Sequence, residues 1–194
     1  MARSDNLHQL PEDLPVPMDD GAARHLVGMT LPDLELPSTS GNPVNLSRLE
    51  TRWTVIYCYP RTGLPGRNPT GGLTEWNAIP GARGCTPQSC AYRDQHAALA
   101  RLGARVFGLS TQTTEYQREM VQRLHLSFDV LSDHELKCTK ALRLPVFQFA
   151  GETMTKRCTL LIAKNRIEEC FYPVFPPDGD AEKTLEWLKG RDAR

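Results

Sequence analysis

The stretch Trp53-Thr-Val-Ile-Tyr-Cys-Tyr59 carries the strongest strand signal in this chain of 194 residues. β-Branched and aromatic residues follow one another almost without interruption, which predicts a strand that is buried on both faces. Pro60 follows directly and is expected to end the strand, because proline cannot donate to a ladder of hydrogen bonds. A strand buried on both faces needs cover on either side of its sheet, so this stretch favours an α/β domain.

Helical and strand patterns alternate along the rest of the chain. We predict further strands over residues 105–110, 128–131, 158–163 and 167–172, and helices over residues 87–102, 114–124, 133–142 and 180–188. Thr86 is expected to cap the first helix and Thr114 with Gln117 the second, while Gly103 and Gly190 are expected to end the first and the last. Alternation in the first half implies parallel pairing, and the late hairpin adds antiparallel strands. The predicted fold class is α/β, a central mixed β-sheet flanked by helices on both faces.

The expected organisation is one domain preceded by an arm. Residues 1–25 contain five acidic residues, two arginines and several prolines, and we predict a flexible arm there. Residues 26–190 are expected to form the single domain. Within it, residues 61–84 are rich in glycine and proline and show no periodicity, and a loop of this length is often functional.

The overall charge argues against several kinds of partner. The chain has 23 Lys and Arg against 23 Asp and Glu, so no general positive field would attract nucleic acid or an acidic membrane. The N-terminus lacks the apolar core of a signal peptide, and no run approaches the roughly 20 apolar residues of a membrane span. We therefore expect a cytoplasmic protein, in which the six cysteines are reduced at rest.

Two of the six cysteines lie close together in Gly84-Cys-Thr-Pro-Gln-Ser-Cys90. Cys85 lies at the N-terminus of the predicted helix, where free N–H groups and the positive end of the helix dipole favour an anion. A thiolate is such an anion, and it is the reactive form of cysteine. Arg83, Arg93 and the more distant Arg157 are candidate cationic neighbours.

The spacing of this pair indicates a redox cycle rather than a permanent disulfide. If one helix includes both residues, their Cα atoms lie about 8.6 Å apart, beyond the roughly 7 Å limit for a disulfide. Cys85 and Cys90 could then bond only after local unwinding. We expect Cys85 to be oxidised to a sulfenic acid, which Cys90 captures as the turn opens.

Other interpretations of the pair stay open. The two cysteines could be small core residues of a helix, or they could bind zinc, although their spacing is not that of usual zinc ligands and no second ligand pair accompanies them. A thioredoxin-type disulfide reductase would ordinarily carry a CxxC motif, which is absent. We expect neither a metal ion nor another cofactor.

The sequence resembles the peroxiredoxins over about residues 26–188, and most of all the class of the bacterioferritin comigratory protein, also named PrxQ. The stretches that carry the resemblance are LPDLELP (31–37), VIYCYP (55–60), GCTPQSCAYRD (84–94), VFGLS (106–110), LSD (131–133) and RCTLLI (157–162). The GCTxxxCxxRD pattern is the most specific of them.

The resemblance implies a thioredoxin-like fold and a thiol peroxidase that reduces hydrogen peroxide or organic hydroperoxides. It makes Cys85 the peroxidatic cysteine and Cys90 the resolving cysteine of an atypical two-cysteine member, whose disulfide forms within one chain. Arg157 matches the family arginine that helps to stabilise the thiolate and polarise the peroxide, a role suited to a permanently charged fork of donors. The implied partners are a peroxide and a thioredoxin-like reductant, and the chain is expected to be a monomer or a weak dimer.

The sequence departs from the family just before Cys85. Ala78 and Ala82 occupy the positions of proline and threonine in the family motif PxxxTxxC, and an inserted loop separates Pro60 from Cys85. Trp76 in this loop could shield the thiolate or bind a bulkier hydroperoxide, although a tryptophan in a loop more often anchors it. The candidate replacements for the missing threonine hydroxyl are Thr62, Thr74 and Thr86.

The other four cysteines are expected to pack rather than react. Cys58 and Cys158 lie in apolar strands and are expected to be inert, Cys170 stays ambiguous, and Cys138 is expected to have no role. Two alternative functions remain open. One is a general thiol–disulfide oxidoreductase on the same fold, and the other is a non-enzymatic redox sensor.

Overall fold

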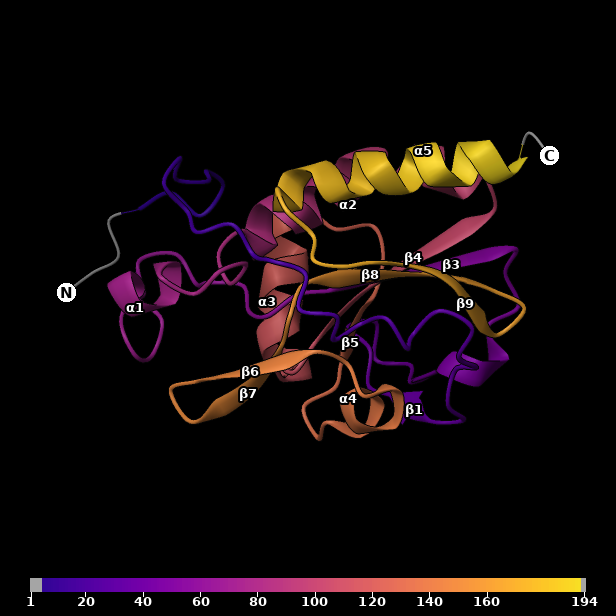
Figure 1. Ribbon diagram of the computed structural model, residues 1–194, viewed down its shortest axis with the longest axis horizontal. Helices are drawn as coiled ribbons and strands as arrows, with labels where there is room; N and C mark the ends of the chain where they lie inside the picture. The colour runs from indigo at the N-terminus through magenta and orange to yellow at the C-terminus, as the bar shows by residue number, and fades with distance from the viewer. Residues whose placement is uncertain (1–4, 193–194) are drawn as a thin grey trace.

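The computed structural model describes residues 5–192, and its centre is a five-stranded mixed sheet in the order β5-β4-β3-β8-β9 (Figure 1). These strands are β3 (Trp53–Cys58), β4 (Ala104–Ser110), β5 (Val130–Ser132), β8 (Cys158–Ala163) and β9 (Arg166–Phe171). β3, β4 and β5 pair in parallel, whereas β8 pairs antiparallel with both β3 and β9. The predicted α/β class, with parallel strands first and an antiparallel hairpin later, is confirmed.

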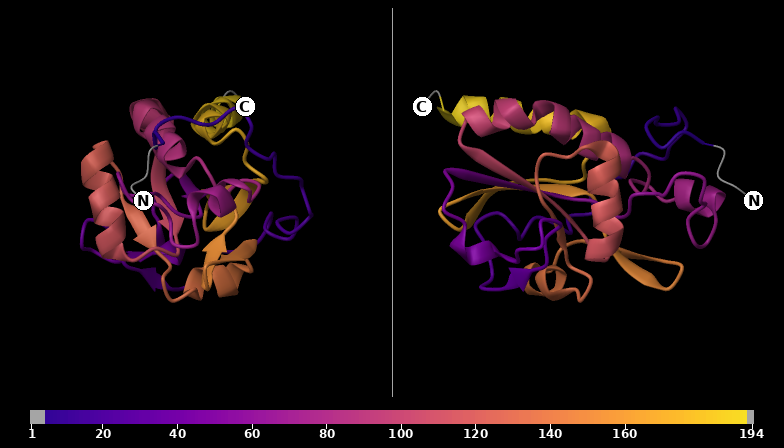
Figure 2. Two further views of the ribbon diagram at one scale, coloured as in Figure 1. Left: turned by 90° about the vertical axis from the view of Figure 1, so that its left-hand side faces the viewer. Right: turned by 180° about the vertical axis from the view of Figure 1, so that it is seen from behind.

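Helices and loops cover both faces of this sheet (Figures 1 and 2). One face carries α2 (Cys85–Arg101), α3 (Thr114–Leu124) and α5 (Asp180–Asp192), and the other carries α4 (Lys137–Leu142) with β1 (Glu35–Leu36), β2 (Val44–Asn45) and the short helix η1 (Leu46–Arg48). α2 and α5 lie side by side along the first face. The sheet is therefore shielded from water on both sides.

β3 separates two apolar clusters. Val55 and Tyr57 pack into the cluster below α2, Ile56 and Cys58 pack into the cluster beside α4, and all four are fully buried. Because successive side chains of a strand point to opposite faces, a strand in this position must be apolar throughout. This explains the uninterrupted apolar run in the sequence.

α2 begins at Cys85, two residues before its predicted start, and Gly84 rather than Thr86 is its cap. Gly84 has a φ of 107°, a backbone conformation that favours glycine. A Cβ at this position would also lie 2.3 Å from the Pro177 Cγ. Glycine is therefore required here, and it makes Cys85 the first residue of the helix.

Other boundaries also differ from the prediction. The cap of α3 is Thr113, whose side chain accepts a hydrogen bond from the Tyr116 N–H, and not Thr114. α5 continues through Gly190, since a helix tolerates one glycine at a cost of about 1 kcal/mol. The elements outside the predicted ranges are β1, β2, η1, α1 (Leu73–Asn77), β6 (Val146–Phe149), β7 (Glu152–Thr155) and the short helix η2 (Pro177–Gly179). All of them are too short for a periodic pattern to identify them.

The N-terminal segment contacts the domain at several points. Asp5 pairs with Arg83, Asp20 pairs with Lys156 at 2.5 Å, and Ala23 is 4% exposed. The acidic, proline-rich composition does not reveal these ion pairs, because their partners are distant in sequence, and the flexibility of the arm stays a prediction. Residues 1–4 of that predicted arm lie outside the described residues.

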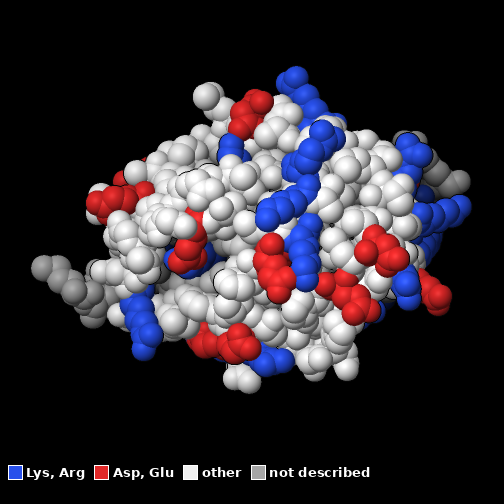
Figure 3. Space-filling model, turned by 90° about the horizontal axis from the view of Figure 1, so that it is seen from below, with Lys and Arg blue, Asp and Glu red and all other residues white. Residues whose placement is uncertain are grey.

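Charged side chains are dispersed over the surface. Seen from below, Lys and Arg side chains are interspersed with Asp and Glu side chains, and large areas carry no charge (Figure 3). This distribution matches the equal numbers of acidic and basic residues. Within residues 5–192, no helix has the length and apolar character needed to span a bilayer.

Leu99 of α2 is fully buried in the cluster between this helix and the sheet. Leu99→Ala should lower the free energy of unfolding by roughly 2–5 kcal/mol, because it removes apolar contacts and leaves a cavity. Urea unfolding followed by circular dichroism measures this loss. Ala100→Ser, on the exposed side of the same helix, is the control and should change the free energy by at most about 0.5 kcal/mol. An equally small loss for Leu99→Ala would contradict the packing.

Candidate functional site

The candidate site lies where the chain leaves β3 and enters α2. Cys85 is the first residue of α2, a helix of 17 residues, and its side chain is 3% exposed. The unpaired N–H groups of a helix N-terminus and the positive end of its dipole stabilise negative charge. The structure therefore places the Cys85 sulfur at the positive end of the α2 dipole.

Arg157 approaches Cys85 from the segment between β7 and β8. Its Nη2 lies 3.2 Å from the Cys85 Sγ, and its side chain is 3% exposed. The same nitrogen lies 3.3, 3.3 and 3.2 Å from the backbone carbonyl oxygens of Gly81, Ala82 and Arg83. Folding thus brings together two predicted site residues that are 72 positions apart in the sequence.

A buried polar network orients Arg157. Its Nη1 donates to the Gln88 Oε1, and the Gln88 Nε2 donates to the Asp180 Oδ2 at 2.7 Å. Tyr92 and Thr159 donate to the same Asp180 oxygen at 3.0 and 2.7 Å. Burial raises the pKa of the Asp180 carboxyl, and these hydrogen bonds oppose the rise. Sequence reasoning missed this network, because no local pattern marks a hydrogen bond between residues 92 positions apart.

The cavity beside Cys85 is small. Its volume is about 20 Å³, which is room for about one water molecule. Its lining residues are Leu7, Arg61, Gly63, Pro69, Trp76, Arg83, Gly84, Cys85 and Thr86. Residues of the N-terminal segment and of the 61–84 loop therefore close over the thiol.

Of the three threonines considered as replacements for the missing hydroxyl, only Thr86 lines this cavity. Thr62 is buried and donates through both its N–H and its hydroxyl to the Gln112 Oε1, whereas Thr74 is exposed. Trp76 is 4% exposed, and its ring lies 5.2 Å from an aromatic ring of β6. The tryptophan therefore both anchors its loop and forms part of the cavity wall.

Cys90 lies in the second turn of α2, so one helix includes both cysteines of the pair. Both thiols are free. Burial raises the pKa of the Cys90 thiol, and the nearby Arg93 opposes the rise. The Cys90 sulfur lies 3.8 Å from the His8 Nδ1. A disulfide between Cys85 and Cys90 requires the first turns of α2 to unwind.

The remaining candidate cations and cysteines contact other groups. Arg83 binds the N-terminal segment through Asp5, whereas Arg93 donates to Asp94 at 2.8 Å and also hydrogen-bonds Cys90. The four cysteines outside the pair pack in the cluster on the opposite face of the sheet from Cys85: Cys58, Cys138, Cys158 and Cys170. They are therefore separated from Cys85 by the sheet.

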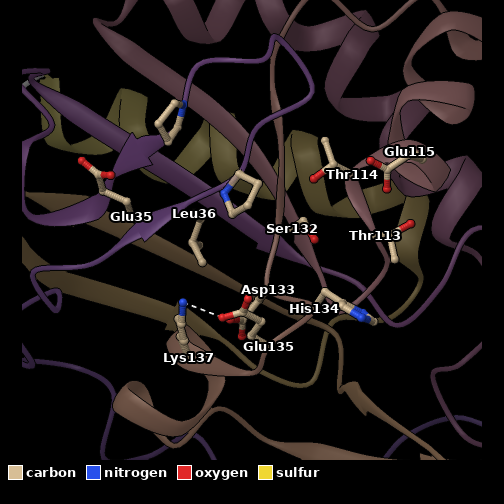
Figure 4. A pocket seen from close by; sticks show the side chains of 12 residues that line it. Glu35, Leu36, Thr113, Thr114, Glu115, Ser132, Asp133, His134, Glu135 and Lys137 are labelled. Atoms are coloured by element: carbon tan, nitrogen blue, oxygen red, sulfur yellow. Dashed lines mark ion pairs between the residues drawn. The ribbon is translucent and has the colours of Figure 1, made fainter.

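A larger pocket, of about 490 Å³, lies between β1 and the starts of α3 and α4 (Figure 4). Its acidic lining residues are Glu35, Glu115, Asp133 and Glu135. Asp133 accepts hydrogen bonds from the N–H groups of Cys138 and Thr139 at 2.9 and 2.7 Å, and Glu135 pairs with Lys137 at 2.5 Å. The lining contains no thiol. Among the described residues, no group of three or more His, Cys, Asp or Glu could hold a metal ion.

The chain is similar in sequence and structure to known proteins. The family model described as Redoxin matches residues 26–186. Peroxiredoxin Q, chloroplastic, of Sedum lineare is 29% identical over 163 residues, which cover 84% of this chain and 77% of that protein. Peroxiredoxin Bcp of Bacillus subtilis is 30% identical over 141 residues, which cover 71% of this chain and 78% of that protein. The crystal structure of peroxidoxin BcpB from Mycobacterium tuberculosis matches with a TM-score of 0.68 and 25% identity, over 84% of this chain and 96% of that chain.

The buried Asp180 carboxyl predicts a pH dependence of stability. Its pKa in the folded protein is raised above the ordinary 3.8, so the folded state holds this proton more tightly than the unfolded chain does. Its contribution to stability is therefore greatest below pH 3.8 and falls as the pH rises through the raised value. Asp180→Asn should remove this fall. Urea unfolding of both proteins between about pH 4 and pH 8 measures the difference, and a difference that is constant over this range would contradict the prediction.

Proposed function

The chain belongs to the Redoxin family and, within it, to the peroxiredoxins of the PrxQ and Bcp type, and we propose that Cys85 is its peroxidatic and Cys90 its resolving cysteine. Peroxiredoxins of this type are thiol-dependent peroxidases with a thioredoxin-like fold. The observation that carries the proposal is the 3.2 Å contact between the Arg157 Nη2 and the Cys85 Sγ at the start of a helix. A thiolate, a fixed cation and a helix N-terminus together provide a nucleophile and two sources of charge stabilisation.

The first step is attack of the Cys85 thiolate on an oxygen of hydrogen peroxide or an organic hydroperoxide. The S–O bond forms as the O–O bond breaks, the sulfur becomes a sulfenic acid, and water or an alcohol leaves after taking a proton. Arg157 and the N–H groups at the start of α2 stabilise the charge that develops on the leaving oxygen.

The second step is attack of the Cys90 sulfur on the Cys85 sulfenic acid. The S–S bond forms, the S–O bond breaks, and water leaves. Because both cysteines lie in α2, the first turns of this helix unwind for the step. A thioredoxin-like dithiol then reduces the disulfide by thiol–disulfide exchange. One chain contains both cysteines, so a monomer or weak dimer in the cytoplasm can complete the cycle.

The missing family threonine favours a slower oxidation of Cys85 by peroxide, and therefore favours the redox-sensor alternative. Ala82 occupies the position of the family threonine, and among the three candidate threonines only Thr86 lines the cavity at the sulfur. Stopped-flow measurement of Cys85 oxidation separates the alternatives. A peroxidase reacts with peroxide far faster than a free thiol does at the same pH. A rate equal to that of a free thiol would favour the sensor or the general oxidoreductase.

Substitution of the two cysteines should divide the cycle into its steps. With one equivalent of peroxide, the wild-type chain should form one disulfide, Cys90→Ser should stop at the Cys85 sulfenic acid, and Cys85→Ser should consume no peroxide. Mass spectrometry with a sulfenic acid trap identifies each species. Cys170→Ser, a partly exposed thiol on the other face of the sheet, is the matched control and should behave as wild type. Full turnover by Cys85→Ser would overturn the assignment.

Arg157→Lys should slow the oxidation of Cys85 by about 100-fold, because the ammonium keeps the charge but lacks the fork of donors. Stopped-flow kinetics with excess peroxide measure the rate, and thermal unfolding checks that the variant is folded. Lys156→Gln removes the neighbouring cation, which pairs with Asp20, and should leave the rate unchanged. Equal rates for Arg157→Lys and wild type would contradict the role of the guanidinium.

A further inference from the structure

Residues 5–9 are attached to the loop that precedes Cys85. Arg83 forms an ion pair with Asp5 and donates through Nη2 to the carbonyl oxygens of Asn6 and Gln9 at 2.8 and 3.3 Å. The Arg83 side chain is 5% exposed, so these bonds are shielded from water. The attachment holds this segment against the start of α2.

His8 is the residue of this segment that reaches Cys90. Its Nδ1 lies 3.8 Å from the Cys90 Sγ, within the range of a hydrogen bond to the large sulfur atom. Its backbone N–H donates to the Asn6 Oδ1 at 2.9 Å, which fixes the turn that carries the imidazole. The ring therefore contacts the atom that attacks in the resolving step.

Cys90 needs a proton acceptor in order to react. Burial raises the pKa of its thiol, so the thiol keeps its proton at neutral pH, whereas the thiolate is the nucleophile. The charged groups that act most strongly on this thiol are Arg93, which hydrogen-bonds it, Asp94 of α2 and Arg123 of α3. Arginine does not accept a proton, and Asp94 is paired with Arg93 at 2.8 Å. A ring nitrogen of a neutral imidazole can accept a proton, and the His8 Nδ1 is the one that lies against this thiol.

We infer that His8 is the general base of the resolving step, an inference that rests on the proposed roles of Cys85 and Cys90. After a peroxide has oxidised Cys85 to the sulfenic acid, the His8 Nδ1 takes the proton of the Cys90 thiol while α2 is still wound. The first turns then open, and the thiolate attacks the Cys85 sulfur. The S–S bond forms, the S–O bond breaks, and the departing hydroxide leaves as water with the proton that His8 returns. One thiol and one sulfenic acid become one disulfide and one water.

The test follows the two chemical steps separately in the full chain. Wild type, His8→Gln and His134→Gln are mixed with one equivalent of hydrogen peroxide, stopped with acid at successive times and analysed by mass spectrometry. His134 is an exposed histidine after β5 and serves as the matched control. The side-chain substitution at position 8 leaves the backbone bonds to Arg83 and Asn6 in place, so the segment stays attached.

The sulfenic acid at Cys85 should form at the same rate in all three proteins. At neutral pH its conversion to the disulfide should be at least about tenfold slower in His8→Gln than in the other two. This difference should shrink as the pH rises to the pKa of the Cys90 thiol, where the thiolate forms without a base, and added imidazole should restore part of the rate.

Two results would overturn the role of His8. One is a rate of disulfide formation in His8→Gln equal to that of His134→Gln. The other is a reduction by the same factor at every pH, which would indicate a structural contact rather than proton transfer. Failure of the proposed function has a different signature, since wild type would then form no sulfenic acid at Cys85.

Discussion

The buried guanidinium of Arg157 is the group on which the rest of the site depends. A permanently charged side chain that is 3% exposed must be compensated, because an unpaired charge removed from water is strongly destabilising. Carbonyl oxygens of residues 81–83 and the Gln88 Oε1 contribute only dipoles, and none of the ion pairs found within residues 5–192 includes Arg157. The Cys85 sulfur is the contact that can carry a full negative charge. The contact between Arg157 and the Cys85 sulfur therefore joins the start of α2 to the segment before β8.

The same interaction constrains the backbone around the thiol. Residues 81–83 direct their carbonyl groups toward Arg157, and the chain then turns at Gly84, with a φ of 107°, directly into α2. Pro177, just before α5, packs so closely on Gly84 that no side chain fits between them. The N-terminal segment and the 61–84 loop close the remaining space, which leaves a cavity of about 20 Å³ at the sulfur. These segments therefore cover the thiol while α2 is wound.

Most of the sheet and its helices could be predicted because their burial patterns are local. β3 and β8 are continuous buried runs, and α3 buries residues three and four positions apart. The prediction fails at helix boundaries where the local sequence offers two suitable capping residues. Thr113 and Thr114 are equally acceptable caps for α3 by residue type, and only the folded backbone selects the first. Gly84 is necessary as a cap because its φ is 107° and because Pro177, distant in sequence, packs against it.

Local sequence was sufficient to establish the order of the central strands and the longer helices, the position of Cys85 at a helix start and the spacing to Cys90, since each depends on residues a few positions apart. It could not select the cation at the sulfur. Arg83 is two residues from Cys85, yet its side chain turns to the N-terminal segment, and Arg157 reaches the sulfur from 72 positions away. The contact of His8 with Cys90 spans 82 positions. The directions of long polar side chains follow from which surfaces pack together, and packing is a property of the whole chain.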